Sequence, residues 1–131
     1  MVIELPSAKK PIEFVGSSLK TLQSFPREVR EDMGYALFLA ESGDKHSDAK
    51  PLKGDPAFRG AGVLEIVERF DGDTYRAVYT VKFEGRVYVL HAFQKKSKRG
   101  IATPKADIDL IKSRLRMAKE HYETVVQKRT A

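Results

Sequence analysis

Cysteine is absent from this chain of 131 residues, and no long apolar run is present either. Without cysteine the protein can hold no disulfide, thiolate zinc site or cysteine nucleophile. The longest apolar stretches, such as 35–40 and 87–90, fall far short of the roughly 20 residues that span a membrane. Residues 1–11 contain acidic, basic and proline residues, and lack the apolar core of a signal peptide. These absences predict a cytoplasmic protein with no membrane partner.

Acidic residues are outnumbered, with 18 Asp and Glu against 24 Lys and Arg and a net charge of +6. Such an excess favours polyanionic partners, because bound phosphates release counterions. Four cations fall within five residues: Lys95, Lys96, Lys98 and Arg99. No acid lies between Glu84 and Asp107. This local charge indicates a surface for nucleic acid, although a solvated loop beside an edge strand would explain the same run.

The length and composition predict one domain, residues 1–131, of class α+β. Helices are expected over 18–42, as a pair, and over 104–127. Ser17 or Ser18 is expected to cap the first, since a hydroxyl can satisfy the free amides of a first turn. Pro26 is typical of the first position of the second helix of the pair, where its missing N–H costs nothing.

Three strands are predicted over 63–70, 75–83 and 86–93, and their short turns indicate an antiparallel meander. The third strand is apolar on both faces, which places it inside the sheet. We therefore expect a strand near Ile12 to cover its free edge, which gives about four strands. The long segment 44–62 is expected to be a loop, and loops of this length are usually functional or mobile. A tolerated surface excursion is an equally good interpretation of it.

The sequence contains no pattern typical of a metal site or of nucleotide-binding and hydrolase motifs. His46, His91 and His121 are far apart in the chain, so no HxxxH-type pair exists. Alternation along the third strand places His91 on the face of Val87, Val89 and Phe93. It is therefore either a half-buried imidazole or, because it lies close to the end of the strand, a residue of the site.

Arg76 stands on the face of the middle strand that alternation marks as polar, where sheet stability alone does not require an arginine. A cross-strand ion pair with Glu65 or Glu68 would account for it. The alternative is a functional role, because the neighbouring strand delivers the lysine run from its end. The two glutamates fall on opposite faces of their strand, which excludes shared acid–base work between them.

Four segments carry a family resemblance: residues 14–18 with Leu22 and Phe25-Pro26, then 51–54, 75–79, and 91–98 with Thr103-Pro104. The most specific parts are a Tyr-Arg-x-x-Tyr strand and a His-x-Phe-x-Lys-Lys strand end. Together they resemble the Gp49-like branch of the RelE/HigB toxin superfamily over nearly the whole chain, including its phage-related members. The resemblance implies a RelE-like fold, with an N-terminal helical pair and a C-terminal helix packed on a curved antiparallel sheet.

The resemblance also implies a toxin of a type II toxin–antitoxin pair that cleaves mRNA on the ribosome, and a cognate helix-turn-helix antitoxin that silences it. Arg76 matches the family's strand arginine that contacts the scissile phosphate, and Lys95 and Lys96 match its basic pair. We assign Lys53, Lys98 and Arg99 to binding the RNA. The RNA supplies its own 2′-hydroxyl nucleophile, so neither a metal nor another cofactor is expected.

Within this scheme the protein must orient the sugar, stabilise charge on the phosphorane and move protons. Arg76 suits the charge because its planar fork binds phosphate oxygens bidentately. Lys95, Lys96 or His91 can serve as general acid or base. A tyrosine that is common near the start of the family's last helix is missing from 100–105, and the first meander strand carries glutamates in place of lysines. These departures favour a rival function, that of a non-catalytic inhibitor of gyrase. A second rival is an accessory protein that only binds RNA or DNA.

Overall fold

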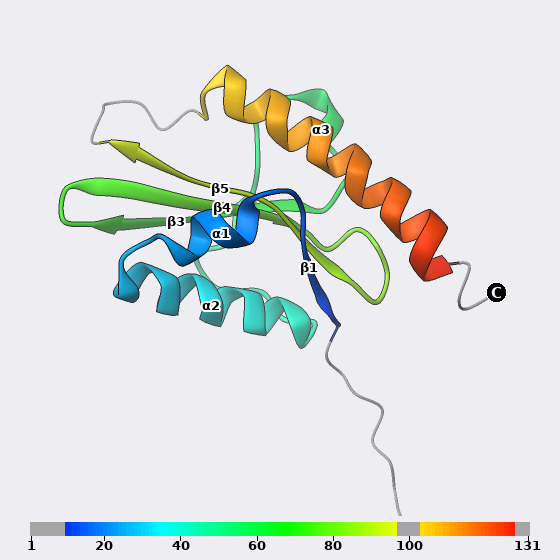
Figure 1. Cartoon of the computed structure of the whole chain (residues 1–131), viewed down its shortest axis with the longest axis horizontal. Coiled ribbons are helices and arrows are strands. Elements are labelled where there is room, and N and C mark those ends of the chain that lie inside the picture. Colours follow the sequence, from blue (N-terminus) through cyan, green and yellow to red (C-terminus); the bar gives the residue numbers. More distant parts are fainter. Residues whose placement is uncertain (1–9, 97–102, 128–131) are drawn as a thin grey trace, which may run out of the picture.

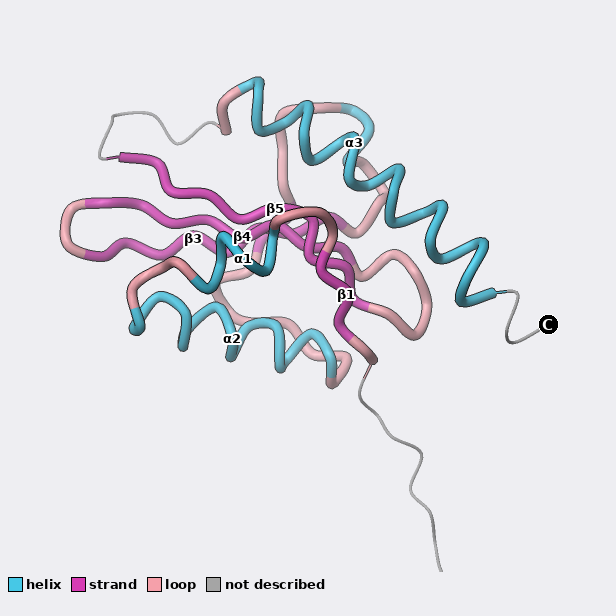
Figure 2. Tube along the Cα trace, in the orientation of Figure 1, coloured by secondary structure: helices cyan, strands magenta, loops and turns pink. Residues whose placement is uncertain are grey.

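The protein is built in three layers, in which a five-stranded sheet lies between α3 on one face and α1 with α2 on the other (Figures 1 and 2). The computed structural model describes residues 10–96 and 103–127. The strands are β1 (Ile12–Phe14), β2 (Lys50–Pro51), β3 (Val63–Phe70), β4 (Asp73–Thr80) and β5 (Val87–Lys96). The helices are α1 (Ser18–Gln23), α2 (Arg27–Glu41) and α3 (Lys105–His121). A 3-10 turn at Pro56–Phe58 and a π-helical turn at Tyr122–Val126 complete the described structure.

The strand order is β1-β5-β4-β3-β2, and it confirms the predicted meander of β3, β4 and β5. β5 lies inside the sheet, and β1 covers its edge as expected, in a parallel pairing. The sequence predicted about four antiparallel strands, whereas the sheet is mixed and has a fifth strand, β2, on the β3 edge. β2 has only two residues, too few for a pattern of alternation to reveal it.

Both N-terminal helices and α3 form where the periodicity predicts them. The proposed side-chain caps are wrong, because both serine hydroxyls have other partners. Ser18 Oγ donates to the Val89 carbonyl at 3.1 Å, and Ser17 Oγ accepts from Arg114 at 3.1 Å. The two serines therefore tie the start of α1 to β5 and α3. No helix within residues 10–96 and 103–127 is long and apolar enough to cross a membrane.

β4 is the central strand, and both of its faces are buried. Tyr75, Ala77 and Tyr79 pack in one core cluster with α2, while Val78 belongs to a second cluster beneath α3. The face of Arg76 is therefore not a polar surface, because Val78 on the same face packs in the cluster beneath α3. Arg76 itself is only 4% exposed. We call this side of the sheet the α3 face.

A β-bulge in β5 shifts the alternation by one residue. Val78 pairs with His91, but the next residue of β4, Tyr79, pairs with Val89, so β5 contains one extra residue at this point. Val87 and Val89 consequently pack in the α2 cluster, whereas His91 lies opposite Val78 on the α3 face. The expectation that His91 shares a face with the two valines is wrong, and its grouping with Phe93 is right.

The segment 44–62 is a structured connection. Besides β2 and the 3-10 turn, it buries Leu52, Phe58 and Ala61 in the core cluster beneath α3. Asp55 ties it to α3 through an ion pair with Lys112 at 3.0 Å. The side chains thus anchor this connection on the α3 face.

Candidate active site

Three polar residues from three adjacent strands project from the α3 face. Glu65 of β3 and His91 of β5 both stand in the row of Val78, and Arg76 lies one row further along β4, opposite Phe93. Directly opposed residues of antiparallel strands share a face of the sheet. Glu65 and His91 therefore flank the strand that carries Arg76. We call Glu65, Arg76 and His91 the strand triad.

Arg76 and Glu65 form a cross-strand ion pair. The distance from Arg76 Nη1 to Glu65 Oε2 is 3.4 Å, and the two side chains are only 4% and 9% exposed. Lys50 stands on β2, at the edge of the sheet. Its ammonium lies 3.8 Å from the other carboxylate oxygen of Glu65. The ion-pair interpretation of Arg76 is thus confirmed. Such a pair also places a guanidinium and a carboxylate side by side in a site largely removed from water.

His91 has a hydrogen-bond partner at each ring nitrogen. Its Nε2 lies 2.7 Å from Asp107 Oδ1, and its Nδ1 lies 3.3 Å from Arg114 Nη1. Because an arginine can only donate, Nδ1 accepts and the proton of the neutral ring resides on Nε2. Burial lowers the pKa of His91, and this effect outweighs the opposing influence of Asp107. The imidazole is therefore neutral at pH 7, and its ring stacks on Phe93 with centroids 4.9 Å apart.

Arg114 of α3 is a buried arginine that fixes the surroundings of His91. Its guanidinium also donates to the Leu90 carbonyl at 3.0 Å and to Ser17 Oγ at 3.1 Å. Burial lowers the pKa of Arg114. Gly16 passes so close that an added Cβ would lie 2.9 Å from the guanidinium Nε. The network thus joins β5, α3 and the β1–α1 connection around the imidazole.

Further cations stand on the same face beyond the triad. Lys95, Thr74 and Arg69 form the row that follows Arg76 and Phe93 towards the β3–β4 turn. This end of the sheet extends past the first turn of α3 (Figure 1). Arg69 is exposed, and sequence analysis did not identify it as a site residue. Alternation could have done so, because Arg69 lies two positions after Val67, the residue that pairs with Arg76. The α3 face therefore carries positive charge along its free end.

The structure describes only some of the other residues that were expected in the site. Lys53 is exposed and lines a cavity of about 340 Å³ together with Glu65 and Thr103. Lys96 pairs with Asp73 in the strand register, but its side chain is not described. Lys98 and Arg99 lie outside the described residues. Within residues 10–96 and 103–127 no group of three or more His, Cys, Asp or Glu residues could hold a metal ion.

Glu65 is the site residue that sequence analysis undervalued. The sequence pattern offered it as half of a carboxylate pair with Glu68 and as an ion-pair partner of Arg76, but not as a catalytic group. Glu68 indeed lies on the opposite face, in the row of Tyr75. The informative signal was its register with β4, because pairing Phe70 with Asp73 places Glu65 next to Arg76. A carboxylate, a guanidinium and an imidazole on three neighbouring strands can together accept a proton, stabilise an anion and bind a phosphate.

Comparison with known proteins finds a family model and a solved structure that each match most of the chain. The model of the family described as "Phage derived protein Gp49-like" matches residues 20–116. Among solved structures, the toxin–antitoxin complex RelBE2 from Mycobacterium tuberculosis is similar at 19% identity, with a TM-score of 0.44. The similarity covers 66% of this chain and 99% of that one. No curated protein matches the sequence.

Proposed function

This chain belongs to the Gp49-like family, a family of RelE/HigB-type toxins, and we propose that it cleaves mRNA on the ribosome as the toxin of a type II toxin–antitoxin pair. The strand triad is the observation that carries this proposal. It offers a carboxylate and an imidazole on either side of an arginine, on a face that bears further cations. This set of groups suits attack by a 2′-hydroxyl on the adjacent phosphate.

The reaction needs one proton to be removed and one to be supplied. In our proposal Glu65 accepts the proton of the 2′-hydroxyl, and the 2′-oxygen forms a bond to phosphorus. Arg76 stabilises the charge that develops on the phosphorane oxygens. The bond from phosphorus to the 5′-oxygen then breaks, and the leaving oxygen takes a proton from a general acid. The products are a 2′,3′-cyclic phosphate and a 5′-hydroxyl, and no step requires a metal ion.

Lys95, Lys96 and His91 are the proposed sources of the second proton. Lys95 is on the α3 face beside the triad, whereas both ring nitrogens of His91 are engaged. His91 can therefore act as the acid only if it first gains a second proton, because the neutral ring would otherwise be left as an anion, and only when the substrate displaces Asp107 from Nε2. This cost favours a lysine as the acid and a positioning role for His91. Lys53, Lys98 and Arg99 are proposed to hold the RNA backbone.

We further propose that a cognate helix-turn-helix antitoxin silences the toxin. Chemically, a cationic face that must be neutralised calls for an acidic, partly disordered segment that folds on contact. Co-expression with the adjacent gene should relieve growth arrest and give a complex that co-purifies. Two proteins that elute separately at low salt would contradict the pairing.

A second candidate function is binding without catalysis, as in a gyrase-type inhibitor or a nucleic-acid accessory protein. The burial of Arg76 and its ion pair with Glu65 favour this alternative, because a phosphate must compete with the carboxylate for the guanidinium. Desolvated ion pairs are costly to break. The nuclease proposal therefore requires that the substrate enter between the two side chains or displace one of them.

Induced expression followed by mapping of mRNA 5′ ends separates the two candidates. The wild-type chain should produce new 5′ ends that carry hydroxyl groups, both in cells and with purified ribosomes in the presence of EDTA. Arg76→Ala should lower the cleavage rate by about 10²–10³, since a charge partner of the transition state is lost. Arg30→Ala, an exposed arginine on α2, provides the control and should cleave normally. Full toxicity of Arg76→Ala with no cleavage by either protein would establish the inhibitor function instead.

A further inference from the structure

A second cavity, of about 540 Å³, is lined by residues of the loop 51–60 next to the strand triad. We propose that it binds the base of an RNA nucleotide that flanks the scissile phosphate, with Arg59 as the residue that contacts the base. This inference rests on the proposed function and adds a binding subsite to it. The volume of this cavity falls within the range of about 300–1,000 Å³ that is usual for small-molecule pockets.

The walls of this cavity are held in place without a ligand. Leu52 and Phe58 are each 5% exposed and anchor the loop in the core beneath α3. The Leu52 amide donates to the Val63 carbonyl at 3.0 Å, which fixes one end of the loop against β3. Asp55 Oδ1 accepts from the Ala57 amide at 2.8 Å and caps the 3-10 turn. The loop therefore presents a preformed apolar surface, which lowers the entropic cost of binding.

The charge around the cavity suits a nucleotide. Arg59 and Lys53 are both exposed cations, and neither has an acidic partner within the described part of the chain. The one acid of the lining, Asp55, is already satisfied: the Ala57 amide and then the Lys112 ammonium keep its pKa below the usual range. The cavity thus keeps a positive balance while its floor is apolar.

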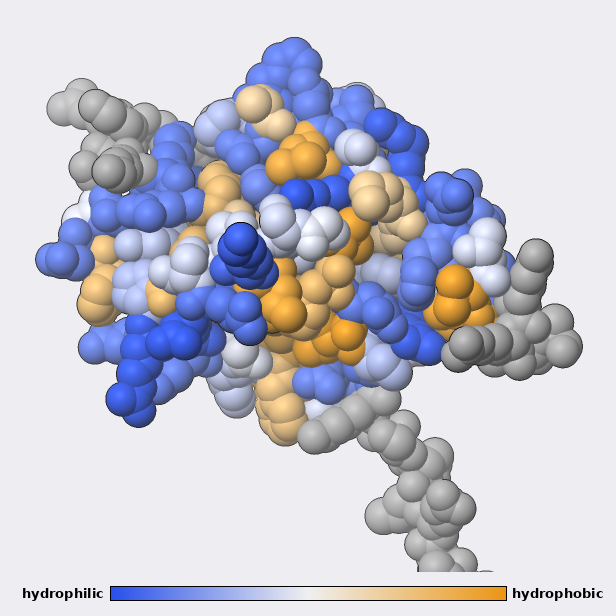
Figure 3. Space-filling view, viewed as in Figure 1, coloured by the Kyte–Doolittle hydropathy of each residue, from blue (hydrophilic) through white to orange (hydrophobic). Residues whose placement is uncertain are grey.

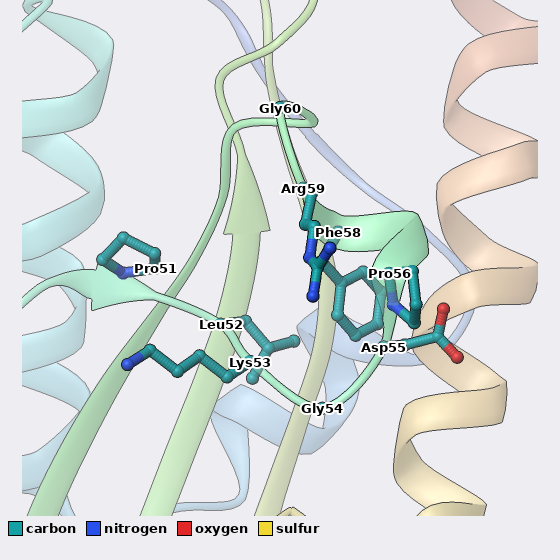
Figure 4. A pocket seen from close by; sticks show the side chains of 9 residues that line it. All are labelled: Pro51, Leu52, Lys53, Gly54, Asp55, Pro56, Phe58, Arg59 and Gly60. Atoms are coloured by element: carbon teal, nitrogen blue, oxygen red, sulfur yellow. The ribbon is translucent and has the colours of Figure 1, made fainter.

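Arg59 and Lys53 lie on different sides of the cavity. Figure 4 shows the Arg59 side chain beside the Phe58 ring, while Lys53 extends to the other side, towards Pro51. A guanidinium plane next to an aromatic ring offers surfaces on which any base can stack. A lysine at the rim behaves as a point charge for phosphate. The arrangement therefore assigns the base to Arg59 and the backbone to Lys53.

The cavity adjoins the proposed active site. Residues 51–54 line both this cavity and the smaller one that includes Glu65 and Thr103. Lys53 is thus shared by the two spaces, and Glu65 leads directly to Arg76. A single strand of RNA that places a phosphate at Arg76 can therefore reach the loop with a neighbouring nucleotide.

Binding of an uncleavable RNA tests this inference without requiring catalysis. The probe is a fluorescent hexaribonucleotide with a 2′-O-methyl group at every sugar, and the readout is fluorescence anisotropy. Arg59→Ala should weaken binding about tenfold, as expected for the loss of one base-stacking contact. Lys53→Gln should lower the slope of log K against log salt by about 0.7, the value for one phosphate on a single strand. Arg30→Ala on α2 is the matched control and should bind like the wild type.

An abasic version of the same oligonucleotide distinguishes base from phosphate recognition. The wild type should bind it more weakly than the complete RNA, and Arg59→Ala should cause no additional loss. If Arg59→Ala binds both oligonucleotides as the wild type does, the inference is overturned even where mRNA is cleaved. Equal losses on both would assign Arg59 to phosphate and overturn the base pocket. If Arg59→Ala loses tenfold in affinity for the complete RNA only, and the wild type cleaves no mRNA, the base pocket is supported and the nuclease proposal is contradicted.

Discussion

Arg76 and Glu65 lie on neighbouring strands, with 3.4 Å between Nη1 of the arginine and Oε2 of the glutamate. Both side chains are nearly buried, so this contact is the least solvated charge pair of the described site. In the resting protein it satisfies two charges that would otherwise be costly to bury. In the proposed reaction the two groups have different roles: Glu65 accepts the proton of the 2′-hydroxyl, and Arg76 binds the phosphate.

Glu65→Gln should abolish mRNA cleavage, because the amide cannot accept the 2′-hydroxyl proton. Loss of a general base typically lowers the rate by about 10²–10⁴. Glu68→Gln is the matched control, since Glu68 lies on the same strand but on the opposite face. Desolvation and the nearby Asp32 carboxylate raise the pKa of Glu68, so its neutral replacement should leave the fold intact. Cleavage rates from primer extension on a defined mRNA provide the comparison, and equal rates for both variants would exclude Glu65 as the base.

Gly16→Ala should destabilise the protein, whereas Gly34→Ala should stabilise it. Gly16 has φ +58°, and its added methyl group would meet the Arg114 guanidinium. We expect a loss of about 1–3 kcal/mol in the free energy of unfolding from the strained backbone and the displaced arginine. Gly34 lies in α2 with no atom within 4 Å of an added Cβ, so alanine should gain about 0.5–1 kcal/mol there. Urea denaturation of both variants measures the difference, and a neutral Gly16→Ala would contradict the locked network.

His91 should make the stability depend on pH on the acidic side of neutrality. Burial places its folded-state pKa below the ordinary value of 6.5. As the pH falls below about 6.5, the unfolded chain binds a proton that the folded chain does not. The free energy of unfolding then decreases by at most about 1.4 kcal/mol per pH unit, until the pH reaches the lower folded-state pKa.

Urea denaturation of the wild type and of His91→Gln between pH 7.5 and 5.5 tests this linkage. The variant should be less stable at pH 7.5, because it loses the pairing with Asp107 and Arg114, but its stability should change less with pH. Parallel curves for the two proteins would show that His91 does not titrate below its unfolded value.

Tyr88→Phe should lower stability, whereas Tyr79→Phe should not. Both tyrosines are almost fully buried. Tyr79 Oη has no hydrogen-bond partner in the described structure, and burial raises the pKa of Tyr79 to about 12. Its removal should therefore leave stability unchanged or raise it by up to about 1 kcal/mol. The Tyr88 hydroxyl lies 2.8 Å from His121 Nδ1, and its removal should cost about 0.5–1.5 kcal/mol. Thermal denaturation of the two variants is sufficient, and equal shifts would show that Tyr79 also has a partner in solution.

The surface at the β1 side of the molecule is less polar than its surroundings. Figure 3 shows apolar residues gathered across the middle of the face where α1 and β1 lie, with hydrophilic residues around them. Leu19 of α1 is 39% exposed, and on α2 Tyr35 is 56% exposed. These residues had been expected on helices, but helical periodicity identifies the buried stripe only and does not say how much of the remaining surface is apolar.

Features of the fold that depend on neighbouring residues in the sequence could be predicted, whereas features that depend on the exact pairing of distant residues could not. The meander, the interior position of β5 and the helix pair follow from alternation, turns and periodicity, and the structure confirms them. The bulge at His91 could not be predicted, because residues 87–93 are almost uniformly apolar and a one-residue shift leaves no trace in such a run. The pairing of Glu65 with Arg76 depends on strand register, which the hairpin fixes only when its turn is placed to the residue.

The hydrogen bond between Ser17 and Arg114 joins positions 97 residues apart in the sequence. β1 likewise needs β5 for its pairing, so the N-terminal strand has no partner until most of the chain exists. During synthesis the first forty residues can form helical turns, yet they cannot complete the network around His91. The strand triad therefore acquires its surroundings only after α3 has been made. Under the proposed function, the ribosome that translates this mRNA therefore meets no assembled site while the chain is still short.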